Sequence, residues 1–201
     1  MSEFIAFMEL GFRHIVAWDA ADHILFLLVL AAIYRGRDWR AALLVVSAFT
    51  IGHSVTLLLA VTDTLVLPSA IVEFLIPVTI VATAVENIWL RERAARGATA
   101  RHRPVFAVIF GLVHGAGFAG YLRSLFMDDI AVPLLGFNVG IELGQVVVLA
   151  ASAALFLAVD RGLRMLPRRA HWPDAFQLRV IAVSATIAVI ATGWAAERFP
   201  R

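Results

Sequence analysis

Six long apolar stretches constrain the fold of this chain more than any other feature of its sequence. A helix needs about 20 apolar residues to cross the hydrocarbon core of a bilayer, and each stretch has about that length. The six stretches cover residues 17–34, 41–61, 69–90, 104–126, 131–159 and 177–196. Residues 3–16 form a shorter apolar stretch, which we expect to be an interfacial helix or an extension of the first span. The pattern predicts an all-α fold, a polytopic membrane helix bundle in a single domain over residues 1–201.

The composition excludes an ordinary soluble domain. Hydrophobic residues make up 61% of the chain and charged residues 16%, against about 45–50% and about 25% in soluble proteins. The mean hydropathy is +0.86. A soluble fold of this composition would lack the polar surface to cover itself, so we expect the lipid bilayer to surround the protein.

The basic residues predict how the spans are oriented. All 17 are arginine, and most lie in every second connection between apolar stretches. These are Arg35, Arg37 and Arg40, then Arg91, Arg93, Arg96, Arg101 and Arg103, and then Arg161, Arg164, Arg168 and Arg169. The other two connections contain Asp63 and the pair Asp128 and Asp129 instead. The pattern predicts a multi-pass protein of the cytoplasmic membrane, with the arginine-rich loops in the cytoplasm and both termini outside.

Two further expectations follow from charge. The formal net charge is only +2, so the arginines reflect topology and nucleic acid is not an expected partner. The N-terminal stretch contains Glu3 and Glu9 and has no basic segment before its apolar residues. We therefore expect no cleaved signal peptide.

Polar side chains inside the apolar stretches point to function, because burying them in lipid is costly without a partner or a purpose. From the N-terminus these are His14, Asp19, Asp22, His23, Thr50, His53, Ser54, Glu73, Glu86, His114, Asn138, Glu142 and Gln145. At a rise of about 1.5 Å per residue, His23 lies about 9 Å from the outer boundary and His53 about 12 Å. The same count puts Glu142 at about 16 Å and His114 at about 18 Å. Four helices thus place a costly group in one band of depth.

Helical spacing predicts which of these side chains face one another. Asn138, Glu142 and Gln145 are spaced to share one face, as are Thr50 and His53. His14 and His23 are nine residues apart and would lie on opposite faces of one continuous helix. These two histidines can join one site only if the chain breaks near Trp18–Ala21.

A site of imidazole and carboxylate groups suits borderline divalent metals, and the chain has no cysteine to supply thiolate ligands. We expect a nickel, cobalt or zinc ion to be held by six side chains. These are His14, Asp22, His23, His53, His114 and Glu142. A second set is expected to support the site or line the pathway to it. This set is Asp19, Thr50, Ser54, Glu73, Glu86, Asn138 and Gln145.

Each of these residues also has a simpler interpretation. A lone membrane histidine often bonds to a backbone carbonyl, and Asp19 or Asp22 would cap a helix N-terminus. Glu73 would extend to the interface, and Glu86 would pair with an arginine-rich loop. Asn138 and Gln145 would join neighbouring helices, as the glycines at spacings of four in the fourth and fifth stretches also predict.

Five blocks of the sequence resemble, in the same order, signature blocks of the HupE/UreJ family of bacterial membrane proteins. The blocks are GFRHIVAWDAADHILFLLVL, FTIGHSVTLLLA, VENI, FGLVHGAGFAGYL and FNVGIELGQ. The resemblance runs from about Gly11 to Gln145 and implies an inner-membrane protein of a group proposed to act as nickel or cobalt permeases. The residues that match are His14, Asp22, His23, His53, Glu86, His114, Asn138, Glu142 and Gln145.

The sequence leaves three functions open. The first is movement of a divalent metal ion across the membrane, by a single chain or by a homo-oligomer, since no internal repeat indicates an alternating-access carrier. The second is a zinc metallohydrolase acting on a lipid or another membrane substrate, with Glu142 or Glu86 as base. The third is a metal-binding assembly factor.

Overall fold

The structure is a computed structural model that describes residues 2–17, 20–65, 67–97, 101–125, 130–165 and 173–200. Within these residues all regular structure is helical, which confirms the all-α class. The helices are α1 (Glu3–Val16), α2 (Ala21–Ala32), the 3-10 turn η2 (Gly36–Asp38), α3 (Trp39–Val61), α4 (Ser69–Ala95), α5 (Arg103–Leu125), α6 (Ala131–Met165) and α7 (Ala175–Glu197).

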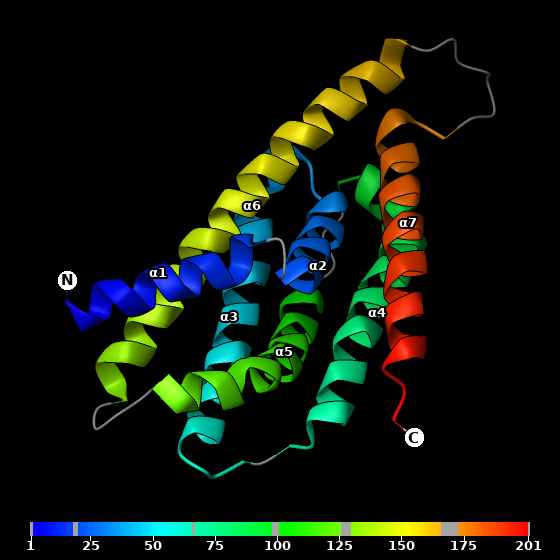
Figure 1. Cartoon of the computed structure of the whole chain (residues 1–201). Helices are drawn as coiled ribbons and strands as arrows, with labels where there is room; N and C mark the ends of the chain where they lie inside the picture. The colour runs from blue at the N-terminus through cyan, green and yellow to red at the C-terminus, as the bar shows by residue number, and fades with distance from the viewer. Residues whose placement is uncertain are drawn as a thin grey trace.

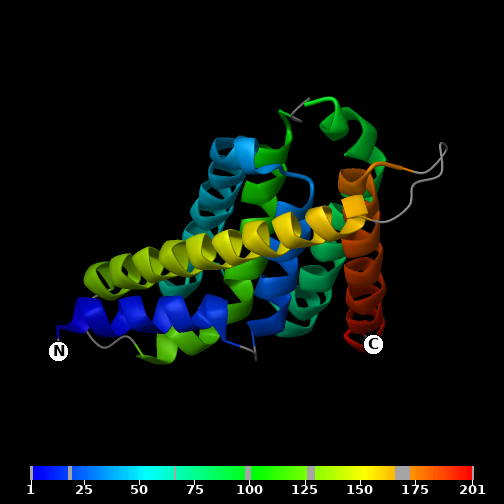
Figure 2. The same cartoon turned by 90° about the horizontal axis from the view of Figure 1, so that it is seen from above.

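The bundle is built from three helix pairs arranged around α2. The pairs are α3 with α5, α1 with α6, and α4 with α7, and α2 contacts at least one helix of each pair. Figures 1 and 2 both show α1 beside the first half of the long helix α6, and α4 beside α7. The short helix α2 lies between the pairs (Figure 1).

Glycines bring two of these pairs into backbone contact. A Cβ atom on Gly140 of α6 would overlap the carbonyl oxygen of Met8 of α1. A Cβ atom on Gly111 of α5 would overlap the carbonyl oxygen of Phe49 of α3. Small residues allow this approach in lipid, where packing holds helices together. The predicted role of the glycine-rich stretches in helix packing is therefore confirmed.

The helices long enough to cross a membrane differ in part from the six predicted spans. By length and apolar composition, the described residues contain four, namely Gly36–Val61, Ser69–Ala95, Ala131–Met165 and Ala175–Glu197. The helices α1 and α2 together make a fifth candidate, bent by 68° at the break between them. The α5 helix, Arg103–Leu125, has 23 residues, and its segment Arg103–Phe118 is an apolar helix.

The first predicted span, 17–34, is wrong as a single helix. The helix in this region begins at Ala21 and has 12 residues, which is too short to cross a bilayer alone. The break arises because Ala17, which follows α1, is extended, with ψ of 147°. Residues 3–16 form α1, which packs along α6 and makes with α2 either one broken span or a re-entrant loop.

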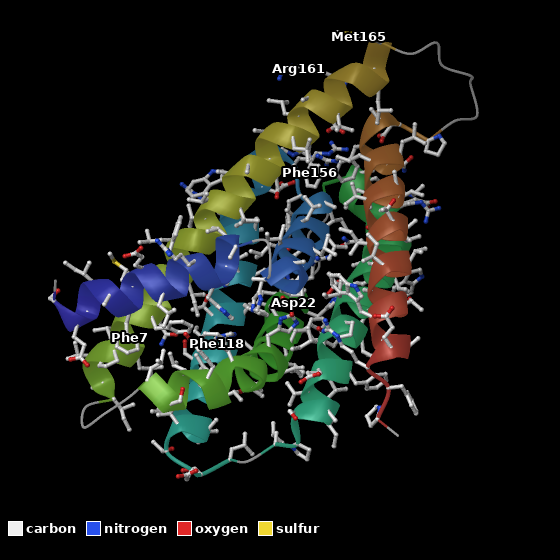
Figure 3. All side chains as sticks on the ribbon, in the orientation of Figure 1. Phe7, Asp22, Phe118, Phe156, Arg161 and Met165 are labelled. Atoms are coloured by element: carbon white, nitrogen blue, oxygen red, sulfur yellow. The ribbon has the colours of Figure 1, made fainter. Side chains whose placement is uncertain are left out.

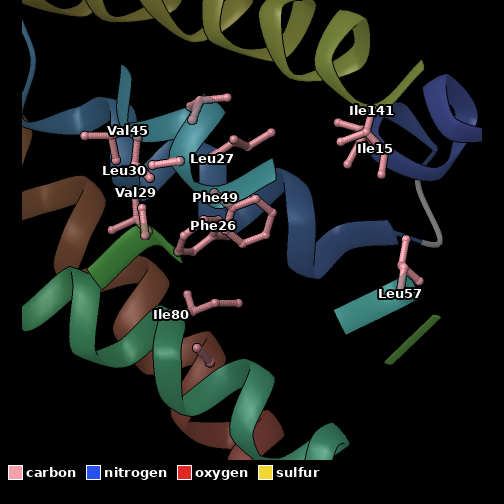
Figure 4. Close-up of a cluster of buried hydrophobic side chains, with 14 of the residues drawn as sticks. Ile15, Phe26, Leu27, Val29, Leu30, Val45, Phe49, Leu57, Ile80 and Ile141 are labelled. Atoms are coloured by element: carbon pink, nitrogen blue, oxygen red, sulfur yellow. The ribbon is translucent and has the colours of Figure 1, made fainter. Parts of the chain in front are cut away.

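The sequence of α2 explains its central position. After His23 it reads ILFLLVLAA, without a polar side chain, and a helix that is apolar all round belongs in a core. Phe26, Leu27, Val29 and Leu30 are at most 2% exposed. Figure 4 shows these side chains packed with Val45 and Phe49 of α3 and Ile80 of α4.

Candidate metal site

The break between α1 and α2 brings His14 and His23 together. Their ring centroids are 4.5 Å apart, although the two residues would lie on opposite faces of an unbroken helix. These two histidines could join one site only if the chain breaks near Trp18–Ala21. The chain does break there, because α1 ends at Val16 and α2 begins at Ala21.

Two more histidines join them from α3 and α5. The His53 ring lies 6.0 Å from the His14 ring and 6.1 Å from the His23 ring. The His114 ring lies 5.4 Å from the His23 ring. His53 reaches this position because Gly111 and Gly115 bring α5 against its backbone. We call these four residues, from α1, α2, α3 and α5, the histidine cluster.

Two hydrogen bonds orient rings of the histidine cluster. Asp22 Oδ1 lies 3.0 Å from His23 Nδ1 and also accepts from the His23 backbone N–H at 2.8 Å. Because an ionised carboxylate only accepts, His23 Nδ1 is the donor in this contact. Thr79 Oγ1 of α4 lies 3.0 Å from His114 Nε2.

Several ring nitrogens of the cluster are buried without a hydrogen-bond partner. They are His14 Nε2, His23 Nε2, both nitrogens of His53 and His114 Nδ1. Most buried polar atoms in proteins are paired, so such a group needs an explanation. Yet no three His, Asp or Glu side chains of the described residues are arranged to hold a metal ion as they stand. Coordination of an ion by the cluster requires some rings to rotate.

A cavity of about 800 Å³ opens onto the cluster. Its lining includes His14, His23 and His114, the acidic side chains of Asp22 and Glu73, and the basic side chains of Arg13 and Arg198. Glu73 is exposed, whereas Asp22 is partly buried beside His23. Figure 3 shows Asp22 near the middle of the bundle. The cavity therefore presents imidazole groups together with two carboxylates and two arginines.

Aromatic rings that the sequence analysis did not single out surround the cluster. The ring centroid of Phe118 lies 4.0 Å from that of His14. The ring centroids of Phe26 and Phe49 lie 5.1 and 5.2 Å from that of His114. Phe26 follows His23 by three residues, Phe49 precedes His53 by four, and Phe118 follows His114 by four. This spacing places a phenylalanine on the same helix face as His23, His53 and His114, so the sequence could have identified these three rings. Thr79 was missed too, although Thr79, Thr83 and Asn87 recur every four residues.

Glu142 does not join the histidine cluster, so the prediction that it lies there is wrong. Its side chain is exposed on the outside of α6, whereas Gln145 is fully buried. The α6 helix turns Phe137, Ile141 and the glycine stripe towards the bundle. Glu142 lies about 60° further around the helix than Gln145, beyond the buried sector. Asn138, between these limits, is partly buried.

Thr50, Ser54 and Gln145 form a polar contact between helices. Thr50 Oγ1 donates to Gln145 Oε1 at 2.8 Å, which joins α3 to α6, and Ser54 Oγ donates to the Thr50 carbonyl at 2.7 Å. The simpler interpretation, a hydrogen bond between helices, therefore describes Gln145. These contacts hold α3, the helix that presents His53.

Glu86 also follows its simpler interpretation. Its carboxylate pairs with Arg103 at 3.1 Å and with His102, so it lies with the arginine-rich connection and away from the cluster. Arg103 also donates to Asn87 Oδ1 at 2.9 Å. Asp19 lies outside the described residues, as do Asp128, Asp129, Arg168 and Arg169.

The fold and the candidate site define an integral membrane helix bundle that gathers four histidines from four helices. The chain belongs to the HupE/UreJ family, since the family described as HupE / UreJ protein matches residues 1–198. The match extends the resemblance seen in the sequence through α7. A search of curated proteins and a search of solved structures found no match to the chain.

Proposed function

We propose that the protein is a permease for a divalent transition-metal ion of the nickel or cobalt type. Membership of the HupE/UreJ family supports transport of these metals. In this proposal the ion is the transported substrate, which binds the histidine cluster transiently and then dissociates from it. Neutral imidazole is a ligand that nickel and cobalt accept readily.

The observation that carries the proposal is the histidine cluster with its unpartnered nitrogens next to a cavity. A buried polar atom without a partner costs about 1–3 kcal/mol. An ion that accepts lone pairs from these rings would recover part of that cost. This provides a reason for four helices to retain histidines in a region where aromatic and aliphatic side chains otherwise pack.

The lining of the cavity supports a route for the ion. Glu73 at the exposed side and Asp22 next to His23 offer carboxylates to a cation. Arg13 and Arg198 also line the cavity, and Arg13 is paired with Glu9. Beyond His53 and His114 the route meets Phe26 and Phe49, whose rings are 4.9 Å apart and nearly fully buried. In this arrangement the cavity side is open and the phenylalanine side is closed. A conformational change at these two rings is needed for passage.

Uptake by vesicles that contain the purified protein tests the proposal. His23→Ala and His114→Ala each remove one ring of the cluster, and we expect nickel or cobalt uptake to fall by about 10–100-fold. Uptake is measured with the metal ion outside and a metal-sensitive dye inside. Empty vesicles give the background.

Two variants serve as controls. His102→Ala removes a histidine outside the cluster, and Glu142→Gln removes a charge from α6 that faces away from it. Both should keep uptake within about twofold of the unmodified protein, the spread expected for a surface change. Uptake that survives loss of His23 and His114, or uptake lost in Glu142→Gln, would contradict the proposed site.

A further inference from the structure

A second cavity, of about 740 Å³, lies between α2, α3, α6 and α7. It contains Phe156, which Figure 3 shows well away from Asp22 and Phe118. The cavity exists because α6 crosses the bundle at an angle and reaches α7 only near its C-terminal end (Figure 1). The proposed route of the metal ion does not pass through this cavity.

One wall of this cavity is apolar and built from small residues. Ala150, Ala153 and Ala154 of α6 line it, together with Leu157 of the same helix and Leu43 of α3. The side chains of all three alanines are exposed. A side chain no larger than a methyl group leaves room beside the helix for an extended hydrocarbon chain.

The other end of the cavity is charged. Arg35, Arg164 and Arg179 line it, against Asp160 and Asp174. Both acids already have partners, because Asp160 pairs with Arg179 at 3.4 Å and Asp174 caps α7 by accepting from the Gln177 N–H at 2.8 Å. Three arginines against two carboxylates leave a formal charge of +1 at this end, and the arginine paired with Asp160 is Arg179.

Two of the arginines keep donors for a ligand. Arg179 is 4% exposed, and its Nε is buried without a hydrogen-bond partner. Arg164 is exposed and has no hydrogen bond or ion pair to any side chain that the structure describes. Trp39, which is 55% exposed, lines the same cavity, and tryptophan is common at the level of lipid head groups.

We infer that this cavity binds an anionic phospholipid. An acyl chain lies along Ala150, Ala153 and Ala154, and the phosphate lies at Arg164 and Arg179. Basic pockets between membrane helices bind anionic head groups by this combination of charge and apolar contact. A water-soluble anion would gain nothing from contact with the apolar wall, and an uncharged lipid would gain no ionic contact with the arginines. The inference does not depend on the proposed transport of metal.

Native mass spectrometry of the full chain, released from nanodiscs of equal parts phosphatidylglycerol and phosphatidylcholine, tests the inference. We expect one phosphatidylglycerol to be retained over phosphatidylcholine by about fivefold, the effect of one arginine near a head group. Arg164→Gln should remove this preference. Ala154→Trp should fill the apolar wall and lower the retention of both lipids.

Matched controls lie on the same helix. Arg161→Gln removes the same charge, and Ala151→Trp adds the same bulk, at positions that do not line the cavity; both should retain phosphatidylglycerol. Equal retention of the two lipids by the unmodified protein would overturn the inference, as would equal effects of Arg164→Gln and Arg161→Gln. Binding of glycerol phosphate without acyl chains, or a dimer whose formation Ala154→Trp abolishes, would show another occupant and overturn it as well.

Discussion

His53 is the residue whose surroundings most limit what the candidate site can do. Its side chain is fully buried, and neither ring nitrogen has a hydrogen-bond partner. Its neighbours are the His14 and His23 rings and Phe49 of its own helix, 5.9 Å away. An apolar residue would pack here at lower cost, so stability alone does not account for the imidazole.

We therefore expect His53→Leu to separate stability from function. Replacing an unsatisfied polar group with an apolar side chain should leave the free energy of unfolding within about 1 kcal/mol of the original or raise it. Metal uptake should be lost. Thermal unfolding in detergent and vesicle uptake measure the two effects on one preparation.

The control for this variant lies one turn further along α3. Leu57 is fully buried and apolar, so Leu57→Ala should destabilise the protein by about 2–5 kcal/mol. If His53→Leu destabilises the protein as strongly as Leu57→Ala does, the imidazole is a structural group and the argument from its missing partners fails.

At the scale of elements, the close helix pairs and the broken first span are the features that build the site. The contact of α5 with α3 positions His53 and His114, and the contact of α1 with α6 positions His14. Both pairs run parallel, as shown for α1 and α6 by Gly136 facing Phe4 and Gly144 facing Ile15. The pair α4 and α7 is antiparallel, since Phe74 contacts Phe199 and Asn87 contacts Ser184.

Gly140→Ala tests how strongly the α1–α6 pair depends on a missing side chain. The added methyl group would overlap the Met8 carbonyl oxygen, so α1 must move, and we expect a loss of about 1–3 kcal/mol in stability. Gly162→Ala is the matched change on the same helix, because nothing lies within 4 Å of the added atom.

For Gly162→Ala we expect a gain of up to about 1 kcal/mol, the difference in helix propensity between the two residues. The comparison is made by thermal unfolding of both variants in one detergent. Equal stability of the two variants would mean that α1 does not pack on α6 as described.

At the scale of the whole molecule, the two cavities lie in different parts of the bundle. The first opens onto the histidine cluster and is lined by Glu73, Asp22, Arg13 and Arg198, whereas the second is lined by Arg35, Arg164 and Arg179 together with Asp160 and Asp174. The core cluster around Phe26, Leu27 and Leu30 lies within the bundle, where α2 meets α3 and α4 (Figure 4).

The positive-inside pattern predicts which end faces the cytoplasm, and the absence of cysteine makes the orientation easy to measure. Single cysteines at Ser2 and Thr64 should react with a membrane-impermeant maleimide in intact cells. Cysteines at Arg37 and Arg161 should react only after the cells are permeabilised. All four positions are exposed. The reverse labelling pattern would place the histidine cavity on the cytoplasmic side and turn the proposed route around.

The sequence predicted the all-α class, the helices from α3 to α7 and the four histidines that the structure brings together, because hydropathy and the cost of buried histidines are local properties of a chain in lipid. It stated the condition under which His14 and His23 can meet, a chain break near Trp18–Ala21, but it did not predict that break. It placed Glu142 wrongly. A spacing of three or four residues predicts which side chains share a helix face, but it does not predict how much of that face is buried. For Glu86 the sequence left two interpretations open, and only the position of Arg103 decides between them.

The sequence by itself determined that this chain forms membrane helices and that glycines bring some of these helices together. It also determined that histidines lie in apolar stretches, where they carry an energetic cost. Only the tertiary structure decided which helices pair, how far α1 bends from α2, and which side of α6 faces the bundle. These depend on the relative rotation and tilt of helices, which are set by contacts between residues distant in sequence. For that reason Gln145 lies inside and Glu142 outside, although both stand in one short motif.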